Sequence, residues 1–139
     1  MTVLLVDAAN VVGSRPDGWW RDRAGATARL LGRLAVARTS LCAPDGSPIT
    51  EVVAVVEGRA RDVPAPEGVR VVRAEGSGDD ALVACAEDVA ATGTPLVVVT
   101  ADRGLRARLP ADTTAVGPGW LLAQLDRDDG PPSVAAPSA

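Results

Sequence analysis

Residues 2–13 read TVLLVDAANVVG, an apolar run that stops at Asp7 and continues through small residues to Asn10. A short apolar run of this kind predicts a buried strand whose C-terminal end presents Asp7 and Asn10. Residues 95–102, PLVVVTAD, repeat the pattern and end on Asp102. Open α/β sheets place their sites at the C-terminal ends of strands, so we expect both aspartates at one shared edge.

The rest of the chain is expected to alternate between helices and strands. After the strand at 3–6, further strands are predicted at 51–57, 69–73, 96–100 and 114–116. Helices are predicted at 19–38, from about Ser77 to 91, in a turn after Asp102 and from Pro118 onward. Such alternation predicts an α/β fold with a parallel sheet covered on both faces. We expect strand order 3-2-1-4-5, whose first and fourth strands are neighbours with diverging connections above Asp7 and Asp102.

Length and composition fit one folded unit. The 139 residues can bury a sizeable core without disulfides. The sequence is 47% hydrophobic but only 2% aromatic, so Val, Leu and Ala must form most of that core. We expect one domain over residues 1–127 and a disordered tail over residues 128–139, which are rich in Pro, Ala and Ser.

Missing residue types exclude several kinds of chemistry. The sequence has no His, which excludes a Ser-His-Asp triad and the usual His-containing zinc sites. It has no Lys, which excludes a P-loop and a Schiff base. Cys42 and Cys85 have no metal-ligand spacing and are expected to be free thiols. With no basic leader and no apolar run of membrane-spanning length, we expect a cytoplasmic protein.

Carboxylates from separate parts of the chain are expected to converge at the strand edge. They are Asp7, Asp79 and Asp102, joined by Asn10 and Glu57. Like charges at close range disfavour ionisation unless a cation lies between them. A set of oxygen ligands without His or thiolate selects Mg²⁺ or Mn²⁺ over zinc. Such an ion polarises a phosphate and generates hydroxide, which predicts phosphodiesterase or phosphatase chemistry.

The paired acids Asp79 and Asp80 open the helix that begins near Ser77. Asp79 shares a helix face with Leu82 and Val83, so it is expected to point toward the strand edge. Asp80 is expected to complete a capping box with Ser77. A purely structural alternative applies to each acid, because Asp after a strand often caps a turn and acids at a helix start favour the macrodipole.

Four short motifs, in order, resemble a known family. They are VDAANV at 6–11, VE at 56–57, GDD at 78–80 and VTAD at 99–102. Their order and spacing resemble the NYN domain of the PIN-like nuclease superfamily, particularly its YacP-like branch, over residues 3 to about 125. The resemblance implies a PIN-like fold and cleavage of RNA phosphodiester bonds with Mg²⁺ or Mn²⁺, with an endonuclease favoured.

The resemblance also implies roles for individual residues. The family's catalytic positions fall on Asp7, Asn10, Asp79, Asp80 and Asp102. Its metal-binding acids match Asp7, Asp79 and Asp102. Glu57 would be a further metal ligand, but it stands where YacP-like chains usually have Asp, so its carboxylate is shifted by one methylene.

Arginines near the same edge would hold RNA. The candidates are Arg15, Arg59, Arg61, Arg103 and Arg106. They serve equally well in the main alternative, a non-catalytic PIN-like module that binds RNA or protein. A third hypothesis is a small-molecule nucleotide phosphohydrolase, which would need a closed pocket. Whether the ribosome or another protein is a partner stays open, as does the oligomeric state.

Overall fold

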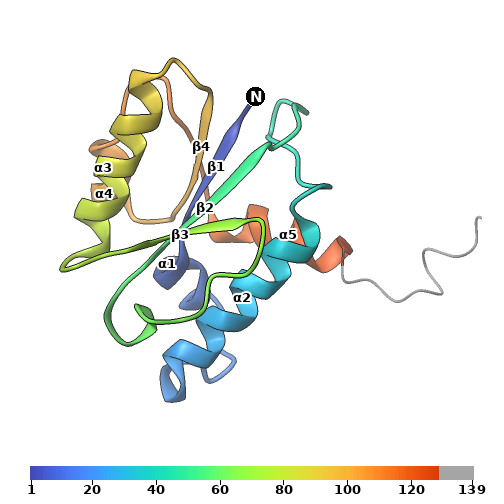
Figure 1. The fold of residues 1–139 in the computed structure, drawn as a ribbon, viewed down its shortest axis with the longest axis vertical. Helices are drawn as coiled ribbons and strands as arrows, with labels where there is room; N and C mark the ends of the chain where they lie inside the picture. The colour runs from blue at the N-terminus through green and yellow to red at the C-terminus, as the bar shows by residue number, and fades with distance from the viewer. Residues whose placement is uncertain (129–139) are drawn as a thin grey trace, which may run out of the picture.

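A five-stranded parallel sheet forms the centre of the protein (Figure 1). The structure, a computed structural model, describes residues 1–128. Its strands are β1 (Val3–Asp7), β2 (Glu51–Val56), β3 (Val69–Arg73), β4 (Leu96–Val99) and β5 (Thr114–Val116). Their order is β3-β2-β1-β4-β5, and all four pairings are parallel. The predicted α/β class and strand order are therefore confirmed.

Helices cover both faces of this sheet. They are α1 (Ala8–Val12), α2 (Arg23–Ala37), α3 (Gly78–Ala91), α4 (Arg103–Ala107) and α5 (Pro118–Asp128), with short 3-10 turns η1 (Trp19–Arg21) and η2 (Gly58–Ala60). The helices α3 and α4 lie on one side, and α1, α2 and α5 lie on the other (Figure 1). No helix within residues 1–128 is both long and apolar enough to span a membrane. The tail predicted at 128–139 lies outside the described residues except for Asp128, where α5 ends.

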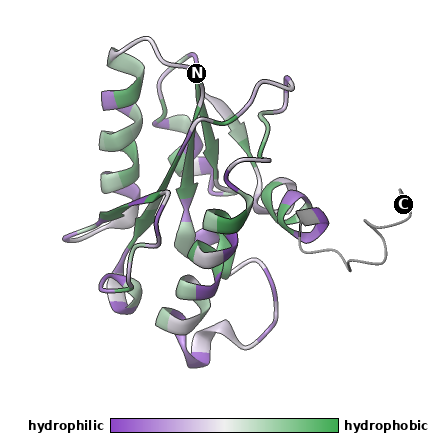
Figure 2. Cartoon of the chain, turned by 45° about the vertical axis from the view of Figure 1, so that its right-hand side comes forward, coloured by the Kyte–Doolittle hydropathy of each residue, from purple (hydrophilic) through white to green (hydrophobic). Residues whose placement is uncertain are grey.

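The alternation of side chains along β1 divides the core into two layers. Leu4 and Val6 belong to the layer that contains Leu31 of α2. Leu5 belongs to the opposite layer with Leu82 of α3. Every residue of β1 is buried, which follows from the helices on both faces. The central strands are accordingly coloured hydrophobic over most of their length in Figure 2.

The structure departs from the predicted elements in several places. The helix predicted at 19–38 is divided into η1 and α2, because Asp22 interrupts it and caps α2 by accepting a hydrogen bond from the Gly25 N–H at 2.9 Å. The short helix α1 was not predicted, and it begins directly at the end of β1, where Asp7 caps it. The strands β2 and β4 end one residue earlier than predicted.

Candidate functional site

Asp7 lies at the centre of the strand edge and is almost fully buried, with 8% of its surface exposed. Its Oδ1 accepts from the Asn10 N–H at 3.3 Å, and its Oδ2 accepts from the Thr100 hydroxyl at 3.0 Å. Burial raises the pKa of Asp7, and the charges of Asp79 and Glu57 raise it further, while both hydrogen bonds oppose this shift. A cation next to Asp7 would favour its ionised form and so offset the effects of burial and of the neighbouring acids.

Thr100 connects Asp7 to Asp102. Val6 pairs with Val99 in the sheet register, so the next residue of each strand, Asp7 and Thr100, also lie side by side. The Thr100 hydroxyl donates to Asp7 and accepts from the Asp102 N–H at 3.2 Å. We did not predict a role for Thr100. Its position between a buried strand and Asp102 could have indicated that its hydroxyl contacts the acids at this edge.

Asp102 is the N-cap of α4. Its Oδ1 accepts from the Leu105 N–H at 3.0 Å. Asp102 itself is exposed. The preceding residue, Ala101, donates its N–H to the Asn10 Oδ1 at 2.8 Å, which ties α1 to the loop after β4. Asn10 therefore lies at the predicted edge, and it uses its carbonyl oxygen for this bond.

Glu57 reaches the start of α3. Its Oε2 accepts from the Gly78 N–H at 3.1 Å. A Cβ atom on residue 78 would lie 2.5 Å from the Glu57 Oε1, so a larger residue there would displace the Glu57 carboxylate from this position. The positive end of the α3 dipole also favours the Glu57 carboxylate in this position.

Asp79 and Asp80 have different surroundings at the start of α3. Asp79 is half-buried, and its pKa is raised by desolvation and by the nearby charges of Asp102 and Glu57, against the opposing effect of Arg108. Asp79 therefore lies close enough to Asp102 and Glu57 to feel their charges. This agrees with the expectation that Asp79 points toward the strand edge.

Asp80 does not have the capping position that we expected. The Ser77 hydroxyl caps α3 by accepting from the Asp79 N–H at 3.2 Å. The Asp80 carboxylate instead forms an exposed ion pair with Arg108 at 2.7 Å. An aspartate is shorter than the Glu of a capping box, and α4 brings a guanidinium close to it.

Four carboxylates thus interact through their charges at one edge, and we call them the acidic edge: Asp7, Glu57, Asp79 and Asp102. Their oxygen ligands fit Mg²⁺ or Mn²⁺ in chemical type. Within residues 1–128, however, no three Asp, Glu or Cys side chains are grouped so that they could hold a metal ion. Three of the four bind backbone N–H groups at helix starts instead. Metal binding at this edge would therefore require side chains to turn.

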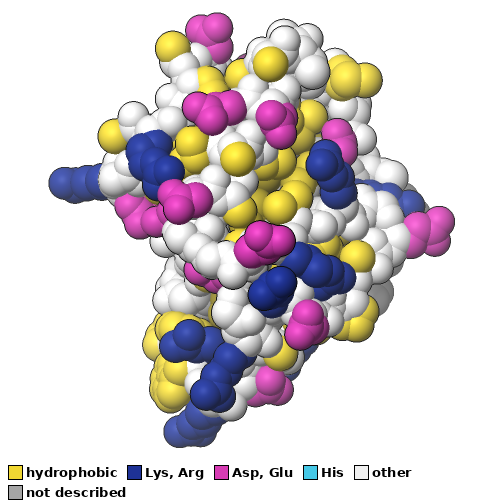
Figure 3. Space-filling view, turned by 60° about the vertical axis from the view of Figure 1, so that its left-hand side comes forward, with side chains coloured by type: hydrophobic (Ala, Val, Ile, Leu, Met, Phe, Trp, Pro, Cys, Tyr) yellow, Lys and Arg dark blue, Asp and Glu magenta, His cyan; other side chains and the backbone are white. Residues whose placement is uncertain are grey.

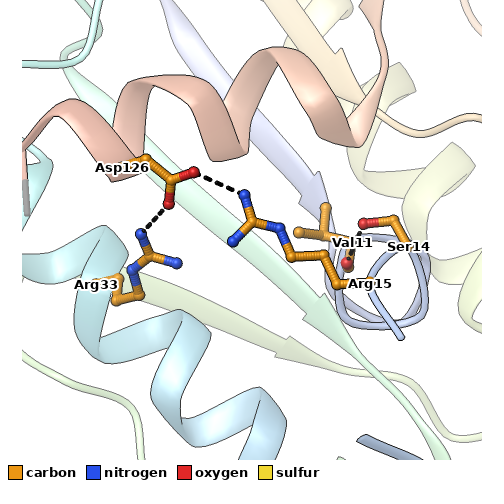
Figure 4. Close-up of polar contacts among 5 residues, drawn as sticks. All are labelled: Val11, Ser14, Arg15, Arg33 and Asp126. Carbon is orange, nitrogen blue, oxygen red and sulfur yellow. Dashed lines mark hydrogen bonds and ion pairs between the residues drawn. The ribbon is translucent and has the colours of Figure 1, made fainter. Parts of the chain in front are cut away.

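The arginines predicted to bind RNA have unequal surroundings. Arg15 forms an ion pair with Asp126 of α5 at 2.7 Å, and Arg33 of α2 contacts the same carboxylate at 2.8 Å (Figure 4). Arg106 donates its Nε–H to the Thr100 carbonyl at 2.9 Å and so supports the end of β4.

The other three candidates, Arg59, Arg61 and Arg103, are exposed. Arg59 also lines the hollows beside Arg23 and the two adjacent tryptophans. Of the five candidates, these three remain the ones best placed to meet a ligand from solvent.

The chain is an α/β fold whose parallel sheet, in the order β3-β2-β1-β4-β5, has the acidic edge at its strand ends. No family model matches the sequence, and no curated protein matches it either. Among solved structures, the chain is similar to Rae1 (YacP) from Bacillus subtilis, with a TM-score of 0.71 and 17% identity over 93% of this chain and 76% of that chain. A point mutant of Rae1 gives a TM-score of 0.67 and 19% identity over 93% of this chain and 77% of that chain. At these identities the likeness shows the fold.

Proposed function

We propose that the protein is a ribonuclease that cleaves RNA phosphodiester bonds with Mg²⁺ or Mn²⁺ bound at the acidic edge, and that it acts as an endonuclease in the cytoplasm. The observation that carries this proposal is the mutual repulsion of carboxylates delivered by separate elements. Desolvation and neighbouring acids raise the pKa values of both Asp7 and Asp79. The likeness of the fold to a protein named YacP supports the resemblance of the motifs to the YacP-like branch.

The residues of the acidic edge would divide the work. Asp7, Asp79 and Asp102 would hold the ion, with Glu57 as a further ligand. A bound ion would polarise the phosphate and lower the pKa of a bound water. Asp7 is the fixed member because Thr100 and the backbone of Asn10 orient both of its oxygens.

Asn10 and Asp80 would support the reaction from either side of this group. The Asn10 carbonyl oxygen holds the loop at Ala101, and its amide group carries N–H donors of the kind that phosphate oxygens accept. Asp80 would act indirectly, because it orients Arg108, whose charge favours ionised Asp79. RNA is the proposed partner, and the ribosome or another protein could present it.

One observation favours a second candidate, a PIN-like module that binds RNA without cleaving it. The carboxylates of Asp7, Glu57 and Asp102 already cap or contact helix starts, and no three acids within residues 1–128 form a metal-binding group. These contacts would suffice to explain the acids as structural groups.

Cleavage of labelled RNA separates the two candidates. We expect purified protein to cut single-stranded and hairpin RNAs in Mn²⁺ or Mg²⁺ but not in EDTA. Asp79→Asn and Asp102→Asn should each lower the rate by more than the roughly 10–100-fold lost when an outer partner of a metal site is removed. Asp112→Asn, which changes an exposed aspartate in the loop before β5, is the matched control and should retain wild-type activity.

The opposite results would contradict the nuclease proposal. Cleavage that persists in EDTA, or full activity of both variants, would exclude catalysis by metal at the acidic edge. Binding of RNA without cleavage at any metal concentration would favour the non-catalytic module.

A further inference from the structure

Two tryptophans and three arginines form a cluster beside the acidic edge, which we call the Trp–Arg patch: Trp19, Trp20, Arg21, Arg23 and Arg59. The two rings meet edge to face, with centroids 6.0 Å apart and an interplanar angle of 87°. The guanidinium carbon of Arg21 lies 5.9 Å from the Trp20 ring centroid, and that of Arg23 lies 5.3 Å from the Trp19 centroid. The patch therefore holds two of the three aromatic side chains in the sequence.

The backbone holds this patch in a defined position. The turn η1 begins after Gly18, whose φ of 84° places it in the left-handed region that favours glycine. The Arg21 N–H donates to the Gly18 carbonyl at 3.0 Å, and Asp22 caps α2 immediately afterwards. Trp20 is nevertheless 53% exposed. An ordered turn thus presents a large apolar ring to solvent.

Two hollows connect the patch to the acidic edge. One, of about 290 Å³, is lined by Trp19 and by Ala8 and Glu57 at the strand ends. The other, of about 530 Å³, is lined by Trp20 and Arg21. Their shared lining residues are Arg23 and Arg59. A chain bound along these arginines would pass from the exposed ring toward the acids.

The three guanidinium groups of the patch outnumber the two carboxylates that line the same hollows, and this favours an anionic ligand. Arg21, Arg23 and Arg59 line the hollows together with the carboxylates of Asp22 and Glu57. Asp22 and Glu57 each accept a backbone N–H, from Gly25 and Gly78 respectively. Figure 3 shows several basic side chains beside a hydrophobic patch at the lower end of the molecule, the end where α2 begins in Figure 1.

Aromatic rings next to guanidinium groups are the side chains that bind unpaired nucleotides. Bases stack on the rings, and arginines contact the backbone phosphates. A duplex keeps its bases stacked on one another, so their faces are not accessible to Trp20. An acidic protein surface could pair with the arginines, but its carboxylates would not cover the exposed Trp20 ring.

We propose that the Trp–Arg patch binds an unpaired nucleotide of single-stranded RNA, with the base stacked on Trp20 and the phosphates contacted by Arg21, Arg23 and Arg59. This inference rests on the proposed function and narrows its substrate to RNA with an unpaired segment next to the cleaved bond.

Binding measured in EDTA tests the patch independently of cleavage. The probes are a fluorescent oligoadenylate of about ten nucleotides and an abasic oligomer of the same length and charge. Trp20→Ala should weaken oligoadenylate binding by about 5- to 150-fold, the loss expected for one stacked base, and should leave abasic binding unchanged. Trp20→Phe should restore most of the lost affinity. Arg21→Ala should weaken the binding of both probes. Arg70→Ala, at an exposed arginine of β3, is the charge-matched control and should weaken the binding of each probe less than Arg21→Ala does.

Three results would overturn the inference. They are unchanged binding by Trp20→Ala, an equal loss on both probes, and absence of binding to either probe at low salt, which would leave the patch to a protein partner. A wild-type protein that cleaves RNA while Trp20→Ala binds normally would refute only the patch. Selective loss in Trp20→Ala without any cleavage would refute only the nuclease.

Discussion

Thr100 has no charge, yet it positions both strand-end aspartates. Its side chain is fully buried, and its hydroxyl is shared between the Asp7 carboxylate and the Asp102 N–H. The carbonyl of the same residue accepts from Arg106. One residue therefore fixes the acid at the end of β1, the loop after β4 and a helix-borne arginine.

We expect Thr100→Val to destabilise the protein by about 1–3 kcal/mol, because the buried Asp7 carboxylate loses a hydrogen-bond donor while the volume of residue 100 hardly changes. The loss of this bond should also raise the pKa of Asp7 further, since the Thr100 hydroxyl opposes the effect of burial. Urea unfolding measures the stability. Thr114→Val, at an exposed position of β5, is the control and should change little. Equal stability of Thr100→Val and wild type would mean that solvent or another group replaces the hydroxyl.

Among the elements, the buried strands were the most predictable. The strand β1 is an apolar run that ends at Asp7, and β4 is an apolar run that Thr100 follows. Such runs fit strands covered on both faces. The helix α1 was not predictable in the same way. Its five residues include Val11, Val12 and Asn10, which are weak helix formers, so it depends on Asp7 as its cap.

The start of α2 shows why a periodic pattern can misplace a helix end. The apolar stripe of this helix extends back from Leu34 through Thr27 to Ala24, and a helix from residue 19 was predicted on that pattern. Asp22 has φ −152° and ψ 78°, which is not helical, and its side chain caps the next turn. The local Asp22 cap therefore separates the turn that holds Trp19 and Trp20 from α2.

The helix α5 is held to the sheet by apolar contacts more than by its ion pairs. Leu125 is 1% exposed, whereas Asp126 pairs with Arg15 and Arg33 at the surface (Figure 4). We expect Leu125→Ala to cost about 2–5 kcal/mol in unfolding free energy. Asp126→Asn should cost far less, and its effect should shrink in high salt.

The pH dependence of the Asp126 contribution has a definite sign. Hydrogen bonds from Arg15 and then Arg33 lower the pKa of Asp126 below its ordinary 3.8. Its contribution is therefore present above pH 3.8 and is lost as the pH falls through the lowered pKa. Urea unfolding at neutral and at acidic pH measures the unfolding free energy of Leu125→Ala, Asp126→Asn and wild type. A larger loss for Asp126→Asn than for Leu125→Ala would show that the ion pairs hold α5.

For the whole molecule, the spacing of the acids along the chain predicted which residues share an edge, but not how each carboxylate is used. Topology alone brings the ends of β1, β2 and β4 and the start of α3 together. Whether an acid faces its neighbours or a backbone N–H depends on contacts such as Thr100 with Asp7 and Gly78 with Glu57. These contacts join residues distant in sequence, so no local pattern reports them.

The acidic edge should therefore destabilise the metal-free protein, and Asp79→Asn tests this. The pKa of Asp79 is raised, so the unfolded chain releases the Asp79 proton before the folded protein does as the pH rises above 3.8. Wild type should lose stability through that interval and reach a constant deficit above the folded-state pKa, whereas the amide has no proton to lose.

In EDTA, the melting temperature of Asp79→Asn minus that of wild type should accordingly grow as the pH rises above 3.8, and it should shrink in high salt, where the repulsion is screened. With Mn²⁺ or Mg²⁺ at neutral pH the order should reverse, because only wild type keeps the full set of proposed ligands and gains stability by binding. Thermal unfolding over a pH series, with and without metal, measures both effects. A difference that is the same at every pH would show that residue 79 acts through helix structure rather than through charge, and a wild type that metal does not stabilise would remove the physical basis for a cation at this edge.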